Sequence, residues 1–154
     1  MTDEEGVTMG SIVVGVDGSE GSRRALLAAL EEARLRKLPL RTVYVLDRRY
    51  LDPEWGVLVA PPIKELEKEA RGILEKLVAS VADQAKGVDV QQEVVLAEKH
   101  GTARTLLDHA SDAELLVVGS RGHGGFAGLL LGSVSHQVLQ FADCPVLVVP
   151  RGAH

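Results

Sequence analysis

Short apolar runs and longer amphipathic segments alternate along the chain. The apolar runs are rich in β-branched residues, which favour strands, and the longer segments repeat apolar residues at helical spacing. We expect strands at residues 12–17, 41–46, 88–96, 115–118 and 145–149. We expect a helix capped by Ser19 or Ser22, and further helices at 63–86, 103–110 and 133–142. Strands separated by helices predict an α/β fold, with parallel strands, right-handed crossovers and helices on both faces of the sheet.

The polarity of each strand predicts its place in the sheet. The runs near residues 12, 115 and 146 are continuously apolar, as in interior parallel strands, whereas polar residues at 91–93 suit an exposed edge. These patterns favour a five-stranded parallel sheet of order 3-2-1-4-5. The first strand then lies beside the fourth, at the switch point where ligands of open α/β sheets bind. The crevice should open between Gly15–Asp17 and Gly119–Arg121.

The same strand order places residues 146–149 at the other edge of the sheet. A long apolar edge strand is an aggregation hazard unless something covers it. We therefore expect this strand to pair with its copy in a homodimer.

Length and composition narrow the class of protein. The 154 residues fit one domain, which we expect at 10–150 with flexible tails at 1–9 and 151–154. A net charge of -5 and 3% aromatic residues argue against a nucleic-acid binder, which needs basic faces and stacking platforms.

Two further features concern the cellular compartment. No apolar run approaches the roughly 20 residues of a spanning helix, and the acidic start lacks the pattern of a leader peptide. The single cysteine, Cys144, excludes an intrachain disulfide and fits a reducing compartment. We expect a cytoplasmic protein without membrane contact, in which Cys144 is a buried structural thiol.

The segment from Gly119 to Ser133 is unusually rich in glycine. Six of its residues are glycine, and it connects an apolar run to the helix predicted to begin at Ser133. Glycine lets backbone N–H groups approach an anion closely, and a helix N-terminus adds unpaired donors and the positive end of its dipole. This segment is therefore predicted to bind phosphate.

Two common phosphate-binding patterns fit this segment poorly. A Walker A loop needs a lysine before the serine, but Leu131 precedes Gly132 and no lysine follows Lys99. A dinucleotide fingerprint can be aligned with residues 122–127 and Asp143. However, that fingerprint belongs after the first strand of the sheet, and its acidic residue ends a strand rather than preceding one.

A third pattern, Gly-x2-Gly-x9-Gly-Ser, fits residues 119, 122, 132 and 133. With it, the chain resembles the ATP-binding branch of the universal stress protein family. The resemblance covers roughly residues 10–150 apart from the loop at 47–62, and it extends to these segments: Ile12–Ser19, Val43–Val45, Val117–Gly122, Gly132–Val138 and Ala142–Val149.

The resemblance implies that ATP binds across the carboxyl ends of the first and fourth strands. Asp17 would bind the ribose or adenine beside the Gly15 backbone, and Val45 and Val118 would form apolar walls for the adenine. Ser133 and the Val134 amide, following Gly132, would donate to a phosphate. Backbone amides would wrap the phosphates over Gly119, Arg121, Gly122, His123, Gly124 and Gly125, and the phosphates would mainly hold any Mg²⁺.

Several of these residues also have a simpler interpretation. Asp17 and Ser133 could act only as helix caps. Arg121 could lie on the surface, and His123 is better read as a solvated loop residue than as a catalytic base. Trp55, in the loop between 47 and 62, could be a lid or a packing anchor.

The sequence shows no evident catalytic dyad, so rapid phosphoryl transfer is not expected. The chain reads as an ATP-binding regulatory protein of stress adaptation, acting on a protein partner that the sequence does not identify. Slow ATP hydrolysis or autophosphorylation, as in related proteins, stays open. A dimeric interaction module without a physiological nucleotide also stays open. An adenylating enzyme is the weaker alternative, since residues 16–22 lack its Ser-Gly-Gly-x-Asp-Ser motif.

Overall fold

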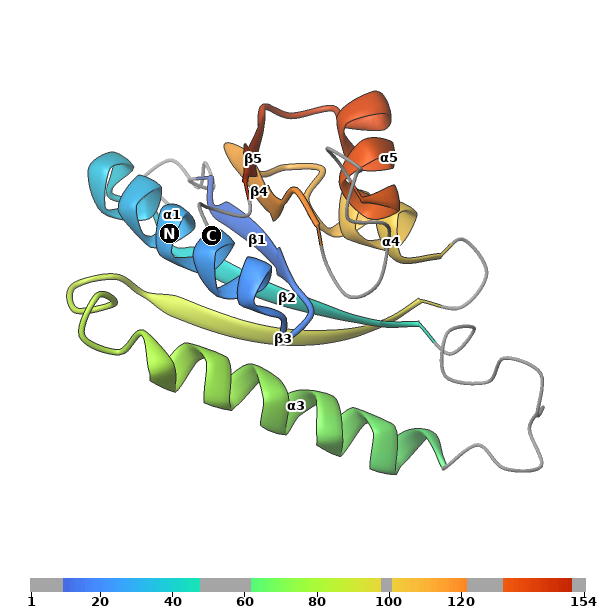
Figure 1. Ribbon diagram of the computed structural model, residues 1–154. Helices are drawn as coiled ribbons and strands as arrows, with labels where there is room; N and C mark the ends of the chain where they lie inside the picture. Colours follow the sequence, from blue (N-terminus) through green and yellow to red (C-terminus); the bar gives the residue numbers. More distant parts are fainter. Residues whose placement is uncertain (1–9, 48–61, 98–100, 122–131, 151–154) are drawn as a thin grey trace, which may run out of the picture.

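A computed structural model of the chain describes residues 10–47, 62–97, 101–121 and 132–150 (Figure 1). The predicted tails and the loop that carries Trp55 lie outside these residues. In chain order the elements are β1 (Ile12–Val16), α1 (Glu20–Arg36), β2 (Leu40–Asp47), α3 (Ile63–Ser80), β3 (Val90–Ala97), α4 (Gly101–His109), β4 (Leu115–Gly119), α5 (Ser133–Phe141) and β5 (Val146–Val149).

The strands form one parallel sheet of order β3-β2-β1-β4-β5, which confirms the predicted order. The third strand, interrupted by polar residues, is an edge, and β5 forms the other edge. Strand β3 pairs with β2 along its whole length, from Leu40↔Val90 to Asp47↔Ala97. The switch point therefore lies between β1 and β4, as the burial pattern predicted.

Side chains of successive strand residues enter two separate cores, one on each face of the sheet. On one face, Ile12, Val14 and Val16 pack under α1 and α3. On the other face, Val13 packs with residues of α4 and with Val138 of α5. The alternation of strand side chains distributes the apolar runs between both cores, so the central strands are apolar throughout.

The helix predicted at 63–86 is shorter than expected. Helix α3 ends at Ser80, and the chain continues in tight turns to Gly87, which has a φ of 84°. These turns are closed by bonds such as Gln84 N–H to the Val81 carbonyl at 3.0 Å. Val81 is buried, so its helical spacing in the sequence reflects burial in a turn rather than another helical residue.

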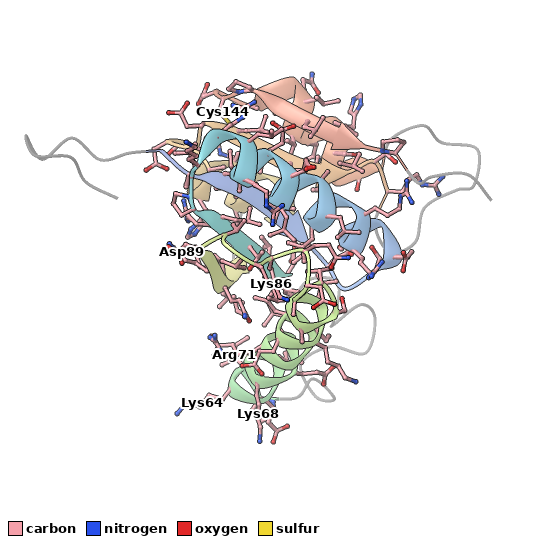
Figure 2. All side chains as sticks on the ribbon, turned by 90° about the vertical axis from the view of Figure 1, so that its left-hand side faces the viewer. Lys64, Lys68, Arg71, Lys86, Asp89 and Cys144 are labelled. Carbon is pink, nitrogen blue, oxygen red and sulfur yellow. The ribbon has the colours of Figure 1, made fainter. Side chains whose placement is uncertain are left out.

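Helix α3 covers the sheet with one side only. Its buried residues are Leu66, Ala70, Leu74 and Leu77. Lys64, Lys68 and Arg71 are exposed and point away from the sheet (Figure 2). Among the described residues, no helix is both long and apolar enough to span a membrane.

Arg41 ties the β2–β3 edge of the sheet to the end of α4. Its guanidinium donates two hydrogen bonds to the Glu93 carboxylate, at 2.8 and 3.0 Å, and a third to the His109 carbonyl at 3.0 Å. The paired guanidinium lowers the pKa of Glu93, outweighing the opposing effect of burial. Arg41 therefore links the edge strand β3, through Glu93, to the end of α4.

Candidate functional site

The strands β1 and β4 separate at their carboxyl ends. Their pairing runs from Ile12↔Leu115 to Val14↔Val117 and stops before either strand ends, at Val16 and Gly119. On its other side β1 stays paired with β2 through Val16↔Tyr44. The structure thus opens the sheet at the predicted switch point, between the two segments that sequence analysis selected.

The turn after β1 fixes the carboxylate of Asp17. Its Oδ1 accepts hydrogen bonds from the Ser19 N–H at 2.9 Å and from the Ser22 hydroxyl at 2.6 Å. Ser19 is the N-cap of α1, since its hydroxyl accepts from the Ser22 N–H at 3.2 Å. Asp17 therefore supports the cap, as its simpler interpretation predicted, and it is held in one orientation at the edge of the opening.

The acidic side chains near this turn affect the pKa of Tyr44 on strand β2. Burial raises the pKa of the Tyr44 hydroxyl, and the negative charges of Asp17 and Glu69 raise this pKa further. Tyr44 lies opposite Val16 in the neighbouring strand. The phenol is therefore neutral at physiological pH and can serve as a hydrogen-bond donor or acceptor.

The first turn of α1 approaches the end of β4 backbone to backbone. A Cβ on Gly21 would lie 2.6 Å from the Arg121 carbonyl oxygen, and a Cβ on Gly119 would lie 3.1 Å from the Gly21 carbonyl oxygen. The contact requires glycine at position 21, since real Cβ atoms do not approach backbone so closely, and at position 119 a Cβ would force the neighbouring backbone to shift. Gly18, with a φ of 84°, packs similarly against Ile73 of α3.

The predicted apolar walls lie on one face of the sheet. Val118 is buried in the core beneath α4 and α5, and Val45 and Val134 are partly buried against it. Gly15 faces the same layer, since a Cβ there would lie 2.7 Å from Leu106 Cδ2. The structure therefore brings the predicted strand residues together with the start of α5.

The start of α5 is attached to the end of β4. The Ser120 carbonyl accepts the Gly132 N–H at 2.6 Å and the Ser135 hydroxyl at 2.9 Å. Gly132 is the N-cap of α5, so the interpretation of Ser133 as the cap is wrong. Ser133 is instead the first residue of the helix, exposed to solvent, and has no cap role because Gly132 takes the extended conformation that an N-cap requires.

This arrangement leaves the first amides of α5 available to an anion. The first intrahelical bond runs from the His136 N–H to the Gly132 carbonyl at 3.0 Å. The N–H groups of Ser133 and Val134 precede it, at the positive end of the helix dipole. Such a helix start is suited to bind phosphate.

The remaining predicted residues divide into two groups. Arg121 is 9% exposed, so its interpretation as a surface residue is wrong. Gly122, His123, Gly124 and Gly125 lie outside the described residues. Sequence reasoning missed Gly21 and Ser135. A glycine in the first turn of a helix and a second serine two residues after Ser133 were the available signals.

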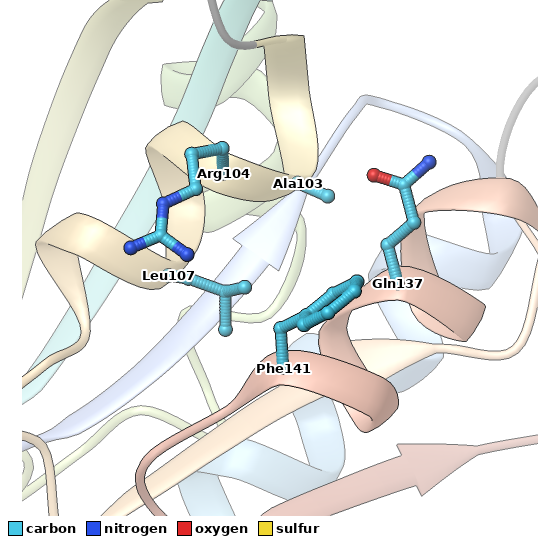
Figure 3. A pocket seen from close by; sticks show the side chains of 5 residues that line it. All are labelled: Ala103, Arg104, Leu107, Gln137 and Phe141. Carbon is cyan, nitrogen blue, oxygen red and sulfur yellow. The ribbon is translucent and has the colours of Figure 1, made fainter.

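An open groove of about 320 Å³ lies between α4 and α5 (Figure 3). Ala103, Arg104 and Leu107 line it from α4, and Gln137 and Phe141 line it from α5. None of these residues belongs to the glycine motif. The groove is therefore separate, in its residues, from the opening at the strand ends.

Two other features of the described residues bear on chemistry. No group of three or more His, Cys, Asp or Glu side chains in this part of the chain is placed to hold a metal ion. Cys144 is partly rather than fully buried, and burial raises the pKa of its thiol, followed by the charge of Asp143. A raised pKa keeps the thiol protonated and weakly nucleophilic.

Comparison with known proteins identifies the family. A family model described as the universal stress protein family matches residues 9–150. The chain belongs to the universal stress protein family. It is 38% identical over 142 residues to a universal stress protein of Mycolicibacterium smegmatis. The matched region covers 91% of this chain and 46% of that protein. The chain thus spans about half the length of this relative. It is 33% identical to the universal stress protein YxiE of Bacillus subtilis, over 90% of this chain and 97% of YxiE.

Solved universal stress proteins share the fold. One from Archaeoglobus fulgidus, in complex with dAMP, is 25% identical with a TM-score of 0.67, covering 92% of this chain and 98% of that one. Another, in complex with cAMP, is 27% identical with a TM-score of 0.66, covering 93% of this chain and 98% of that one.

Proposed function

We propose that this universal stress protein binds ATP at the opening between β1 and β4 and acts as a regulatory protein of stress adaptation. The hydrogen bond from Gly132 N–H to the Ser120 carbonyl carries this proposal. It holds the first amides of α5 beside the end of β4, where β4 no longer pairs with β1. A phosphate group placed there would meet the helix start on one side and the strand end on the other.

The nature of the nucleotide follows from two lines of support. Two similar structures are complexes with dAMP and cAMP, which share an adenine ring and a phosphate. The complete Gly-x2-Gly-x9-Gly-Ser spacing at 119, 122, 132 and 133 resembles that of the ATP-binding branch of the family, and this resemblance supports ATP. In this proposal Val45 and Val118 contact the adenine, and Asp17 accepts from the ribose or adenine. The phosphates themselves mainly hold Mg²⁺.

We further propose that the site holds ATP for sensing rather than for rapid turnover. Fast phosphoryl transfer requires positioned cations and a group that orients the nucleophile. The described residues at the opening contribute backbone amides, the Asp17 carboxylate and Arg121. Such a site stabilises bound phosphate, and slow hydrolysis or autophosphorylation is compatible with it.

The protein is proposed to act as a homodimer through β5. The strand is an edge of the sheet, and all of its residues are only partly buried. Leu139 and Phe141 of the neighbouring helix α5 are 46% and 56% exposed. An apolar edge with exposed apolar neighbours is suited to pairing with a second copy.

Two measurements test nucleotide binding: the identity of the nucleotide that is released from the protein, and the affinity of the protein for ATP. Mass spectrometry of small molecules released from denatured, purified protein should detect an adenine nucleotide. Calorimetry should show that Asp17→Ala and Gly122→Val bind ATP at least tenfold more weakly than wild type. Gly72→Ala is the matched control, because a Cβ at Gly72 meets nothing within 4 Å. Equal affinity in all four proteins would refute the site.

A dimeric interaction module without nucleotide is the alternative. The groove between α4 and α5, with Phe141 exposed at its side, favours a protein contact on that layer. Purified protein that is dimeric, carries no nucleotide and shows no calorimetric response to ATP would support this alternative over the nucleotide proposal.

A further inference from the structure

The hydroxyl of Ser135 contacts two residues of the glycine-rich segment, Ser120 near its start and Gly132 near its end. It donates to the Ser120 carbonyl at 2.9 Å and lies 3.1 Å from the Gly132 carbonyl. The residue is 3% exposed. Together with the Gly132 N–H, which donates to the same Ser120 carbonyl at 2.6 Å, this hydroxyl forms what we call the clasp: Ser120, Gly132 and Ser135.

The Ser135 hydroxyl has a second acceptor besides the usual one of a helical serine. Such a hydroxyl commonly donates to a carbonyl one turn earlier, as Ser80 does to Leu77 at 2.6 Å, and Ser135 has this contact with Gly132 at 3.1 Å. Its shorter bond, at 2.9 Å, reaches Ser120, which lies 15 positions earlier in the chain. A buried hydroxyl must find a partner, and here the partner belongs to the opposite end of the motif.

The clasp is itself anchored in the sheet. The Ser120 N–H donates to the Val149 carbonyl of β5 at 2.8 Å. The Ser120 carbonyl uses both of its lone pairs on α5, one for Gly132 and one for Ser135. The start of α5 is therefore fixed relative to the ends of β4 and β5, and with it the amides of Ser133 and Val134.

We infer that Ser135 is a positioning residue for the phosphates of the nucleotide, although its side chain does not face the ligand. This inference rests on the proposed function. The clasp holds the α5 amides against the β4 end, and those are the groups proposed to bind phosphate. The proposed adenine walls, Val45 and Val118, belong to strands whose pairing does not involve Ser135. Loss of the hydroxyl should therefore weaken phosphate binding more than adenosine binding.

The experiment compares two ligands in three proteins. The affinities of ATP, by calorimetry, and of adenosine, by competition against ATP, are measured for wild type, Ser135→Ala and the matched control Ser80→Ala. We expect ATP to bind Ser135→Ala about tenfold more weakly, as the loss of one buried hydrogen bond implies. Adenosine should change less than twofold. Ser80→Ala removes a local hydroxyl-to-carbonyl bond in α3, outside the proposed site, and should bind both ligands as wild type does.

The remaining outcomes separate this inference from the proposed function. ATP affinity of Ser135→Ala within twofold of wild type, or an equal loss for ATP and adenosine, would overturn the role of Ser135 and leave the site intact. Absence of ATP binding in wild type would overturn both. If Ser135→Ala lacks a cooperative thermal transition, Ser135→Cys, with similar volume and a weak S–H donor, is measured with the same expectation.

Discussion

Gly21 lies so close to Arg121 that a Cβ on the glycine would stand 2.6 Å from the arginine carbonyl oxygen. The contact joins the first turn of α1 to the residue that follows β4 and Ser120. It also brings Gly21 against Gly119, the first glycine of the motif. Two glycines from distant parts of the chain thus allow helix α1 to pack directly behind the candidate site.

This contact predicts that alanine will be harmful at Gly21 even though alanine favours helices. Gly21→Ala should lower the free energy of unfolding by about 1–3 kcal/mol, because the Cβ must displace backbone. Gly72→Ala, on the open side of α3, should raise it by about 0.5–1 kcal/mol through helix propensity. Urea denaturation measures both. Stabilisation by Gly21→Ala would show that the close approach does not exist in solution.

The Arg41–Glu93 pair predicts a component of stability that depends on pH. Because the folded protein lowers the pKa of Glu93, this component is fully present above the usual carboxyl pKa of 4.5. It is lost as the pH falls through the lower pKa of the folded state. Glu93→Gln should therefore cost about 1–2 kcal/mol at pH 7 and progressively less toward pH 3.

The measurement is urea denaturation of wild type and Glu93→Gln across that range. The control is the corresponding change in the exposed pair of Arg104 and Asp108, which are joined at 3.3 Å within α4. Asp108→Asn should cost little at any pH, because exposed pairs contribute little to stability. A constant difference between wild type and Glu93→Gln from pH 7 to pH 3 would contradict the assignment.

The buried carboxylate of Asp47 predicts an effect at the start of α4. Asp47 is 5% exposed and accepts a hydrogen bond from the Thr102 hydroxyl at 3.2 Å. Thr102→Val should destabilise the protein by about 1–3 kcal/mol, because a buried carboxyl oxygen loses a donor. Thr105→Val, which removes a bond to the Gly101 carbonyl, should cost less, since that carbonyl lies within the same helix. Thermal unfolding of both variants tests this prediction. Equal losses of stability in the two variants would contradict it.

The proposed homodimer predicts a specific response to proline in β5. The Pro145 and Val149 carbonyls accept bonds from the Leu116 and Ser120 N–H groups, so the alternate residue Val148 directs its N–H to the outer edge. Val148→Pro should therefore remove a donor from the dimer contact and leave the β4–β5 ladder intact. Light scattering at micromolar concentration should give a dimeric mass for wild type and a monomeric mass for the variant. A monomeric wild type would refute the dimer.

Sequence patterns were sufficient to predict the architecture, because a strand of a parallel sheet that is buried on both faces is apolar along its whole length. The apolar runs at Ile12–Val16 and Leu115–Gly119 mark strands covered on both faces, and the polar residues of β3 mark an edge. From this the strand order and its switch point followed. The end of α3 was misjudged, because Val81 is buried in a turn and keeps the apolar spacing of a helix.

Patterns along the chain identified the residues that carry the candidate chemistry, namely the spaced glycines, Asp17 and the serine after Gly132. How these residues are held depends on contacts between the layers of the fold. The packing of Gly21 on Arg121 and the bond from Ser135 to Ser120 each join residues far apart in the chain. Local propensity depends on near neighbours, whereas these contacts arise from how the layers pack, so no pattern along the chain could predict them.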